Sequence, residues 1–271
     1  MGFGRQVPEK FRKLPSKPRK NKGEVETLML AWKNTQWAAP EKILAIIFEA
    51  GFITPADLQW VSGLSDRTLR RAIQKLAAQH AEPPVQRYRW NSSRVAYYLS
   101  ATGVKMAHSI HGITAKPIVA QGQVSHALGL NGILFRYVRT HPDKPLRWYT
   151  TRDATETLLY LRGQVTGKEE GLLRKTLVHP DAIWQLPQSF WWVEFDNETE
   201  NHYQLTRKYR MYAYNLQPLD PSLQRVMWVT RSVTRCRKMK DLWEKLELNT
   251  PQMRFYVEGQ EKFLGQKIRL P

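Results

Sequence analysis

Cysteine is nearly absent from the sequence, since Cys236 is the single one among 271 residues. One cysteine excludes a disulfide within the chain and a metal cluster held by cysteines. No apolar run is long enough to cross a bilayer, and the basic N-terminus lacks the apolar core of a secretory signal. These absences predict a cytoplasmic protein that does not insert into a membrane.

Acidic residues are scarce beside basic ones: 24 Asp and Glu stand against 42 Lys and Arg, which gives a net charge of +18. Such an excess is the electrostatic footprint of a protein that binds a polyanion. A membrane surface would be indicated by a basic amphipathic helix, and no convincing one is present. Nucleic acid is therefore the favoured partner. A Gly-rich phosphate-binding loop is also lacking, so nucleotide hydrolysis is not expected.

Apolar residues make up 42% of the chain, as in globular proteins, and the length suits one large or two ordinary domains. Residues 1–39 are predicted to form a basic, disordered arm, because its first part is rich in Lys, Arg and Pro and cannot bury a core. The arm could lie along DNA phosphates, or it could be a solvated tail that aids solubility. Residues 40–113 and 121–271 are predicted to form two domains joined by a linker.

Residues 40–113 have the element order of a winged helix, in which three helices precede a hairpin. A first helix runs from about Glu41 and stops at Gly51. Thr54 caps the second helix, with Pro55 as its first residue, and Ser65 caps the third. A basic hairpin over residues 85–99 follows, and then another helix.

Basic side chains on the third helix and the hairpin predict a DNA-binding surface, with the helix in the major groove and the hairpin on the backbone. The residues predicted to contact DNA are Arg67, Arg70, Arg71, Gln74, Lys75, Arg87, Arg89 and Arg94. The alternative is a winged helix used only for protein contact.

Residues 121–271 alternate between helical and strand patterns, which predicts an α/β layout (α+β for the whole chain) with a mixed sheet. The predicted helices are 123–140, 201–215 and about 235–246, and the predicted strands are 146–151, 172–178, 181–185, 190–196, 226–230 and 254–257. Gly129 in the first of these helices permits close packing on a sheet. His126 and Asn131 on the same helix have capping or hydrogen bonding as their default role, and support of an active site as the alternative.

Carboxylates lie at the ends of the two apolar runs of the central hairpin. If Gln185 pairs with Phe190, Asp181 falls opposite Glu194 on one face of the sheet. Paired carboxylates suit Mg²⁺ or Mn²⁺, which polarises a phosphodiester, and we expect Asp181, Glu194 and Asp196 as the metal ligands. The alternative is that Asp196 and the acids that follow it cap the next helix. This alternative is favoured for the acids after Asp196.

Three tryptophans of the hairpin, Trp184, Trp191 and Trp192, could stack on the bases of a single strand. Alternation along the strand turns at least one of them inward, where core packing is its expected role.

The order of these motifs resembles the replication-relaxation family, which includes the MobC-type plasmid mobilisation relaxases. The resemblance rests on the winged helix, His126-Ala127-Leu128, Pro180-Asp181, Val193-Glu194-Phe195-Asp196 and residues 205–214. It covers most of the chain after the basic arm. The second half is similar to the restriction-endonuclease-like fold, whose motif is a Pro-Asp pair followed by Asp or Glu, any residue and Lys.

The resemblance implies roles for single residues. Asp181 matches the motif aspartate and Glu194 the motif acid, but Asp196 stands at the lysine position. Lys208, on the next helix, could replace that lysine. A relaxase usually retains the cut end on a tyrosine, and Tyr203 is the freer candidate because its neighbours on the helix have core spacing.

Three hypotheses about function follow from the resemblance and the charge. The first is a metal-dependent enzyme that binds and nicks double- or single-stranded origin DNA of a plasmid or mobile element, with Asp181, Glu194, Asp196, Lys208 and Tyr203 as catalytic residues. The second is a DNA-binding initiator or regulator with an inactive nuclease-like domain. The third is an accessory protein that recruits a relaxase or coupling protein.

Overall fold

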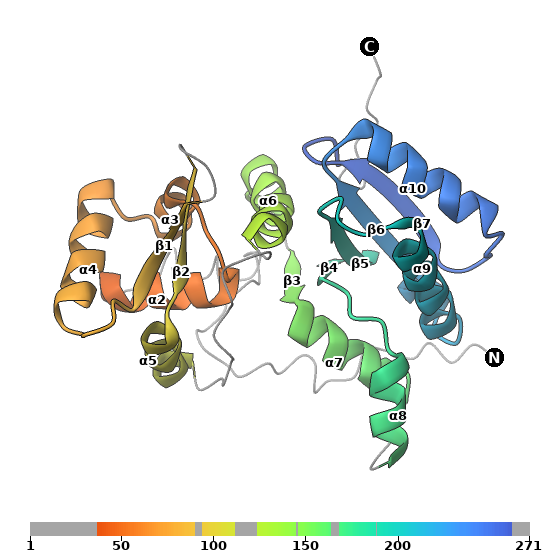
Figure 1. The fold of residues 1–271 in the computed structure, drawn as a ribbon, viewed down its shortest axis with the longest axis horizontal. Coiled ribbons are helices and arrows are strands. Elements are labelled where there is room, and N and C mark those ends of the chain that lie inside the picture. Colours follow the sequence, from red (N-terminus) through yellow and green to blue (C-terminus); the bar gives the residue numbers. More distant parts are fainter. Residues whose placement is uncertain are drawn as a thin grey trace.

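The computed structural model describes residues 37–89, 94–111, 124–144, 146–163, 168–187 and 189–261. The predicted linker between residues 113 and 121 lies outside these ranges, and so does the predicted arm apart from its last three residues. Helices and strands of the described part form a winged module (residues 37–111) and a sheet module (residues 124–261), shown in Figure 1. No described helix is both long and apolar enough to cross a membrane.

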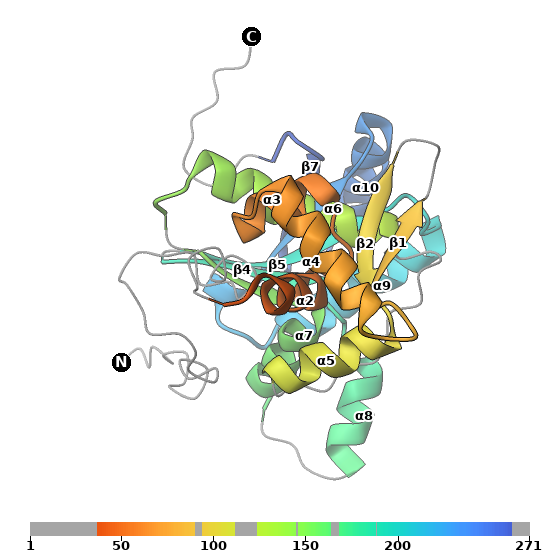
Figure 2. The ribbon, with the colours of Figure 1, turned by 90° about the vertical axis from the view of Figure 1, so that its left-hand side faces the viewer.

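The winged module has the predicted order of three helices and a hairpin. Its elements are α2 (Ala39–Ala50), α3 (Pro55–Ser62), α4 (Asp66–Ala78), β1 (Val85–Arg89), β2 (Val95–Leu99) and α5 (Ala101–His111). The strands β1 and β2 pair antiparallel. Seen from the winged end in Figure 2, α4 lies toward the viewer, and Figure 1 places it at the end of the molecule far from the sheet.

Local capping explains where these helices begin. The Thr54 hydroxyl accepts a hydrogen bond from the Asp57 backbone N at 3.1 Å, and Pro55 is the first residue of α3. The Ser65 hydroxyl accepts from the Thr68 backbone N at 3.2 Å, which starts α4. Both predicted caps are confirmed, because each satisfies an amide that has no partner within its own helix.

The sheet module contains a five-stranded mixed sheet in the order β3-β4-β5-β6-β7. Its strands are β3 (Arg147–Thr150), β4 (Ala182–Leu186), β5 (Ser189–Asp196), β6 (Arg225–Thr230) and β7 (Gln252–Val257). Its helices are α6 (Val124–Thr140), α7 (Thr151–Leu161), α8 (Lys168–Thr176), α9 (His202–Leu216) and α10 (Val233–Lys245). Pairing is antiparallel from β3 to β5 and parallel from β5 to β7, so the predicted α/β class with a mixed sheet is confirmed.

One predicted element is wrong. The sequence predicts a strand over residues 172–178, whereas α8 covers residues 168–176. A short apolar stretch does not distinguish a helix from a strand. The Lys, Glu, Leu and Arg residues around it favour the helix by their intrinsic propensity.

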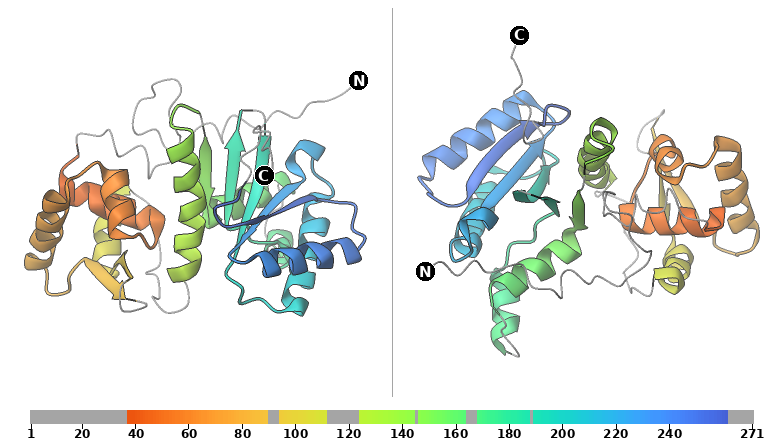
Figure 3. Two further views of the ribbon diagram at one scale, coloured as in Figure 1. Left: turned by 90° about the horizontal axis from the view of Figure 1, so that it is seen from above. Right: turned by 180° about the vertical axis from the view of Figure 1, so that it is seen from behind.

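The two faces of the sheet carry different helices. Trp191, Val193 and Phe195 of β5 pack in the cluster that contains α6, while Trp192 packs in the cluster of α7, α9 and α10. Alternation along the strand therefore turns Glu194 toward α9. Seen from above in Figure 3, α6 lies between the sheet and the winged module. Since Trp184, Trp191 and Trp192 are all buried, they are core residues.

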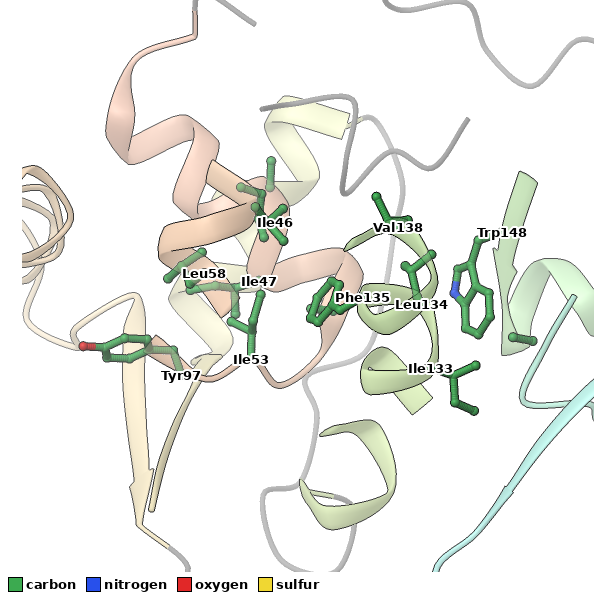
Figure 4. Packing of buried hydrophobic residues seen from close by; sticks show 14 of the residues in the cluster. Ile46, Ile47, Ile53, Leu58, Tyr97, Ile133, Leu134, Phe135, Val138 and Trp148 are labelled. Atoms are coloured by element: carbon green, nitrogen blue, oxygen red, sulfur yellow. The ribbon is translucent and has the colours of Figure 1, made fainter. Parts of the chain in front are cut away.

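Helix α6 joins the two modules into one hydrophobic cluster. Phe135 of α6 points toward Ile47 and Ile53 of the winged module, whereas Leu134 points toward Trp148 on β3 (Figure 4). Apolar burial on both sides of a helix stabilises its position by about 25 cal/mol for each Å² of apolar surface removed from water. The winged module is therefore packed firmly against the sheet module.

Polar contacts reinforce this packing. The side chain of Asn131 on α6 donates to Ala50 O at 2.8 Å and to Phe52 O at 2.9 Å. Arg139 donates to Asp57 at 2.8 Å, and its guanidinium lies 4.6 Å from the ring centroid of Trp60. The default expectation of a hydrogen-bonding role for Asn131 is confirmed, and the contact fixes the end of α2.

Candidate functional site

The register of the central hairpin brings the predicted acids to one end of the sheet. Gln185 pairs with Phe190, as expected, and the Asp181 backbone N donates to Val193 O at 3.0 Å. Asp181 thus lies directly before β4, beside the end of β5 where Glu194 and Asp196 lie. Parallel β6 ends at the same edge, and its Thr230 is the register partner of Asp196.

Glu194 is completely buried and accepts a hydrogen bond on each carboxylate oxygen. Lys208 Nζ donates to Oε2 at 2.7 Å, and the hydroxyl of Tyr212 donates to Oε1. Lys208 and Tyr212 are four residues apart on α9, so they share the helix face that covers the sheet. The helix is set by a capping box, in which Asn201 and Gln204 bind each other's backbone amides.

Burial and charge act in opposite directions on this pair. Burial raises the pKa of Glu194 well above its ordinary value, and the charge of Lys208 opposes the rise. Burial alone would lower the pKa of Lys208, but the negative charges of Glu194, Asp181 and Glu200 raise it instead. Lys208 therefore stays protonated and supplies the positive charge at this end of the sheet.

Asp181 links the sheet to α6. Its Oδ1 lies 3.1 Å from His126 Nε2, and its Oδ2 accepts from the Phe195 backbone N at 2.8 Å. Burial by itself would raise the pKa of Asp181. The hydrogen bond to His126 and the charge of His126 lower this pKa by more, so the net shift is downward. For His126, burial lowers the pKa while the contact with Asp181 raises it, and the net direction is up.

Gly129 allows this contact between the helix and the sheet. A Cβ at position 129 would lie 2.0 Å from Cζ of Phe195, which no real side chain tolerates. The absence of a side chain lets α6 approach β5 closely, as predicted for this glycine, and His126 lies one turn earlier on the helix. His126 thus has a hydrogen-bonding role beside the predicted acids.

Asp196 is bound by an arginine. Arg235 Nε donates to Oδ2 at 2.7 Å and Arg235 Nη2 donates to Oδ1 at 3.0 Å, while the Thr230 hydroxyl donates to Oδ2 at 3.1 Å. The same Nη2 also donates to Glu200 O at 2.6 Å, which holds the loop between β5 and α9. This bidentate arrangement matches the fork of the guanidinium to the two carboxylate oxygens.

A small cavity of about 190 Å³ opens beside these residues. It is lined by His126, Phe195, Asp196, Asn197, Thr199, Glu200, Lys208 and Trp228. The ammonium of Lys208 lies 5.2 Å from the ring centroid of Trp228 and 3.4 Å from Glu200 Oε1. Acidic and basic groups both face this cavity, so it is polar but carries no excess of cations.

The three predicted metal ligands do not fit a metal ion in this arrangement. All six carboxylate oxygens of Asp181, Glu194 and Asp196 accept hydrogen bonds from protein groups, and Lys208 and Arg235 provide the neutralising charge. Within the described part of the chain, no group of three or more His, Cys, Asp or Glu side chains is placed to hold a metal ion.

The structure brings some predicted site residues together and separates others. Asp181, Glu194 and Lys208 form one cluster, and Asp196 lies at the same cavity with Arg235. Tyr203, in contrast, is 75% exposed in the first turn of α9 and does not line the cavity. The predicted DNA-contacting side chains lie on the winged module and are all exposed: Arg67, Arg70, Arg71, Gln74, Lys75, Arg87, Arg89 and Arg94.

Three side-chain partners of the acids were missed by the sequence reasoning: Arg235, Thr230 and Tyr212. Arg235 lies shortly after the end of β6, and parallel strands that end at one edge bring the start of α10 close to Asp196. That topology was the signal that could have identified it. Tyr212 is one of the neighbours of Tyr203 whose helical spacing predicted a core position; it is fully buried, and its hydroxyl also binds Glu194.

Comparison with known proteins gives one match. The family described as replication-relaxation matches residues 44–219, which is well over half of the chain. No match was found among curated proteins or among solved structures. The matched range runs from α2 of the winged module through α9, and so includes Asp181, Glu194 and Lys208. The chain belongs to the replication-relaxation family.

Proposed function

We propose that the protein binds DNA in the replication or relaxation of a plasmid or other mobile element, and that its nuclease-like acid cluster is a structural rather than a metal-binding site. The family supports the first part. The observation that carries the second part is that each carboxylate oxygen of Asp181, Glu194 and Asp196 already has a protein donor. The protein is then an initiator, regulator or accessory factor.

The winged module is the proposed duplex-binding part. Helix α4 exposes a row of basic side chains at the end of the molecule far from the sheet, where a major groove has access. Arg70 is partly compensated by Asp66, whose Oδ2 lies 3.0 Å away. Arg67 and Arg71, on neighbouring turns of the same helix, are the side chains proposed to contribute most of the remaining charge.

The test combines a binding assay with a nicking assay. The purified chain is titrated into a labelled duplex from the origin of its own element, and is then incubated with the supercoiled plasmid, with and without Mg²⁺ or Mn²⁺. Binding that falls at least tenfold in Arg67→Ala/Arg71→Ala, without open circles under either metal, is the expected result. Origin-dependent open circles that disappear in Glu194→Gln contradict the structural role of the acids.

A second candidate function is DNA nicking, and the position of Lys208 favours it. Its ammonium reaches Glu194 from α9, so the cluster contains a lysine beside the motif acid although Asp196 occupies the motif position. In this candidate, opening of the hydrogen bonds of Asp181 and Glu194 would expose oxygen ligands for Mg²⁺ or Mn²⁺.

Nicking by this cluster has its own readouts. Open circles would depend on the metal and would be lost in both Asp181→Asn and Lys208→Met, while duplex binding by the winged module is retained. If Tyr203 holds the cut end, a covalent protein–DNA adduct survives denaturation and is lost in Tyr203→Phe. Open circles without an adduct would indicate hydrolysis by water instead.

A further inference from the structure

The outer face of α9 carries a regular row of aromatic and basic side chains. The members of this α9 row are Tyr203, Arg207, Arg210 and Tyr214, all of them exposed. Their spacing of four, three and four residues places them on one face of the helix. The opposite face contains the buried side chains that pack on the sheet, so the row points away from the core.

Strongly exposed aromatic rings are unusual in the described part of the chain. Among the described residues, the large apolar or aromatic side chains that are strongly exposed are Tyr203 (75%), Tyr214 (59%) and Val233 (55%). Two of these three are the ends of the α9 row. The described tryptophans and phenylalanines of the same module are buried or partly buried, whereas both tyrosines are exposed.

The chemistry of the row suits single-stranded DNA. The helical rise between the two tyrosines separates them by about 16 Å along the axis. Aromatic rings stack on unpaired bases, and guanidinium groups contact the phosphates between them. Arg162 adds a further cation, since its guanidinium lies 5.2 Å from the ring centroid of Tyr214. A duplex offers no free base faces to such a row.

We propose that the α9 row binds single-stranded DNA, with bases stacked on Tyr203 and Tyr214 and phosphates held by Arg207 and Arg210. This inference rests on the proposed function only in taking DNA as the partner, because it concerns a different surface. Figures 1 and 3 place α9 and α4 in different modules at opposite ends of the molecule. The protein would therefore hold duplex at one end and a separated strand at the other.

The proposal is tested by fluorescence anisotropy on the full chain. The probes are a fluorescein-labelled oligonucleotide of twelve thymidines and a labelled duplex of about twenty base pairs. The variant Tyr203→Ala/Tyr214→Ala is expected to weaken binding of the single strand by about tenfold for each ring removed, while duplex affinity stays within twofold. The variant Tyr203→Phe/Tyr214→Phe keeps the rings and is expected to bind the single strand within twofold of the unaltered protein.

A charge-matched pair of variants separates the row from general basicity. Arg207→Ala/Arg210→Ala removes two cations from the row, and Arg237→Ala/Lys238→Ala removes two exposed cations from neighbouring α10. Only the first is expected to weaken the single-stranded complex strongly. The slope of log K against log salt should fall by about 0.7 for each phosphate that is no longer neutralised. Unchanged melting temperatures show that all variants are folded.

The results distinguish this inference from the proposed function. Three results would each overturn the proposal for the α9 row. The first is that Tyr203→Ala/Tyr214→Ala binds the single strand within twofold of the unaltered protein, and the second is that this variant loses as much affinity for the duplex as for the single strand. The third is that the unaltered protein does not bind the single strand. If Arg67→Ala/Arg71→Ala loses duplex binding but keeps single-strand binding, the result supports the winged module as the duplex-binding part and does not test the α9 row. If the unaltered protein binds the single strand through the α9 row but does not bind the duplex, the proposal of duplex binding is wrong and the proposal for the α9 row is retained.

Discussion

Lys208 reaches Glu194 from a different element: its Nζ on α9 lies 2.7 Å from Glu194 Oε2 on β5. The position two residues after the acid, where a nuclease motif has its lysine, is Asp196 with its own arginine. One end of the sheet thus contains two separate carboxylate–cation pairs, with Asp181 and His126 beside them. Each pair buries charge, and the stability of this end depends on the partners remaining together.

Removal of the lysine charge is expected to destabilise the fold. In Lys208→Met the fully buried Glu194 loses its cation, and breaking a buried pair from one side costs about 3–5 kcal/mol. The free energy of unfolding, measured by urea denaturation at pH 8, should fall by this amount. The loss should be smaller at pH 5, because burial raises the pKa of Glu194 and protonation then removes the unpaired charge.

The matched control is the double variant Lys208→Met/Glu194→Gln, which removes both charges. A neutral amide at position 194 can still accept the Tyr212 hydroxyl, so more than half of the lost stability should return. A double variant as unstable as the sum of the two single variants would show that the pair is not coupled.

Arg235 is expected to contribute more to the free energy of unfolding than any exposed arginine on α10. In Arg235→Met the buried Asp196 loses two hydrogen bonds and its charge partner, and the loss of stability should be about 3 kcal/mol. Arg237→Met, on an exposed position of the same helix, is the control and should stay within about 0.5 kcal/mol. Equal effects in the two variants, measured by urea denaturation, would contradict the role of the Asp196 pair.

A partly buried acid makes stability depend on pH near neutrality. Burial, with the charge of Asp153 adding to it, raises the pKa of Glu49 on α2 from its ordinary value of 4.5 to about 7. Between these values the folded protein holds a proton that the unfolded chain has released, so stability falls as the pH rises. The loss is complete above pH 7 and corresponds to about 3 kcal/mol at most.

Substitution of this acid should remove the dependence. Glu49→Gln is expected to unfold at a higher temperature than the unaltered protein at pH 8, and at nearly the same temperature at pH 4. The control is Glu41→Gln at an exposed position of the same helix, which should follow the unaltered protein at both values. A difference for Glu49→Gln that is as large at pH 4 as at pH 8 would show that burial of its charge is not the cause.

Local patterns predicted most of this fold. The caps at Thr54 and Ser65 were visible because they precede apolar periodicity, and the hairpin register followed from pairing Gln185 with Phe190. That register placed Asp181 and Glu194 at one end of the sheet. The family resemblance, rather than a local pattern, implied that Lys208 could reach the acids, and its ammonium contacts Glu194.

Interactions over long separations were not predictable in the same way. The bonds from Arg235 to Asp196 and from Asn131 to the end of α2 depend on how elements far apart in the chain pack. Nothing in the sequence near Asp196 indicates that its charge is already neutralised. A carboxylate at the end of a strand has the same local pattern whether it holds a metal or an arginine.

Compensation of charge also leads to a prediction for the winged module. Arg70 and Arg71 are adjacent and exposed on α4, but Arg70 Nε lies 3.0 Å from Asp66 Oδ2. Each neutralised phosphate contributes about 0.9 to the slope of log K against log salt for duplex DNA. Arg71→Ala should therefore lower the slope by about 0.9, and Arg70→Ala by clearly less, because Asp66 already offsets part of its charge.

The measurement is the anisotropy of a labelled origin duplex, titrated at several NaCl concentrations between about 50 and 200 mM, the range over which counterion release changes affinity strongly. A second background, Asp66→Asn, removes the charge that offsets Arg70. In this background, Arg70→Ala should lower the slope of log K against log salt as much as Arg71→Ala does. Arg237→Ala on α10 controls for net charge and should leave the slope unchanged. Equal slopes for Arg70→Ala and Arg71→Ala in the unaltered background would show that the Asp66 pair does not compete with phosphate.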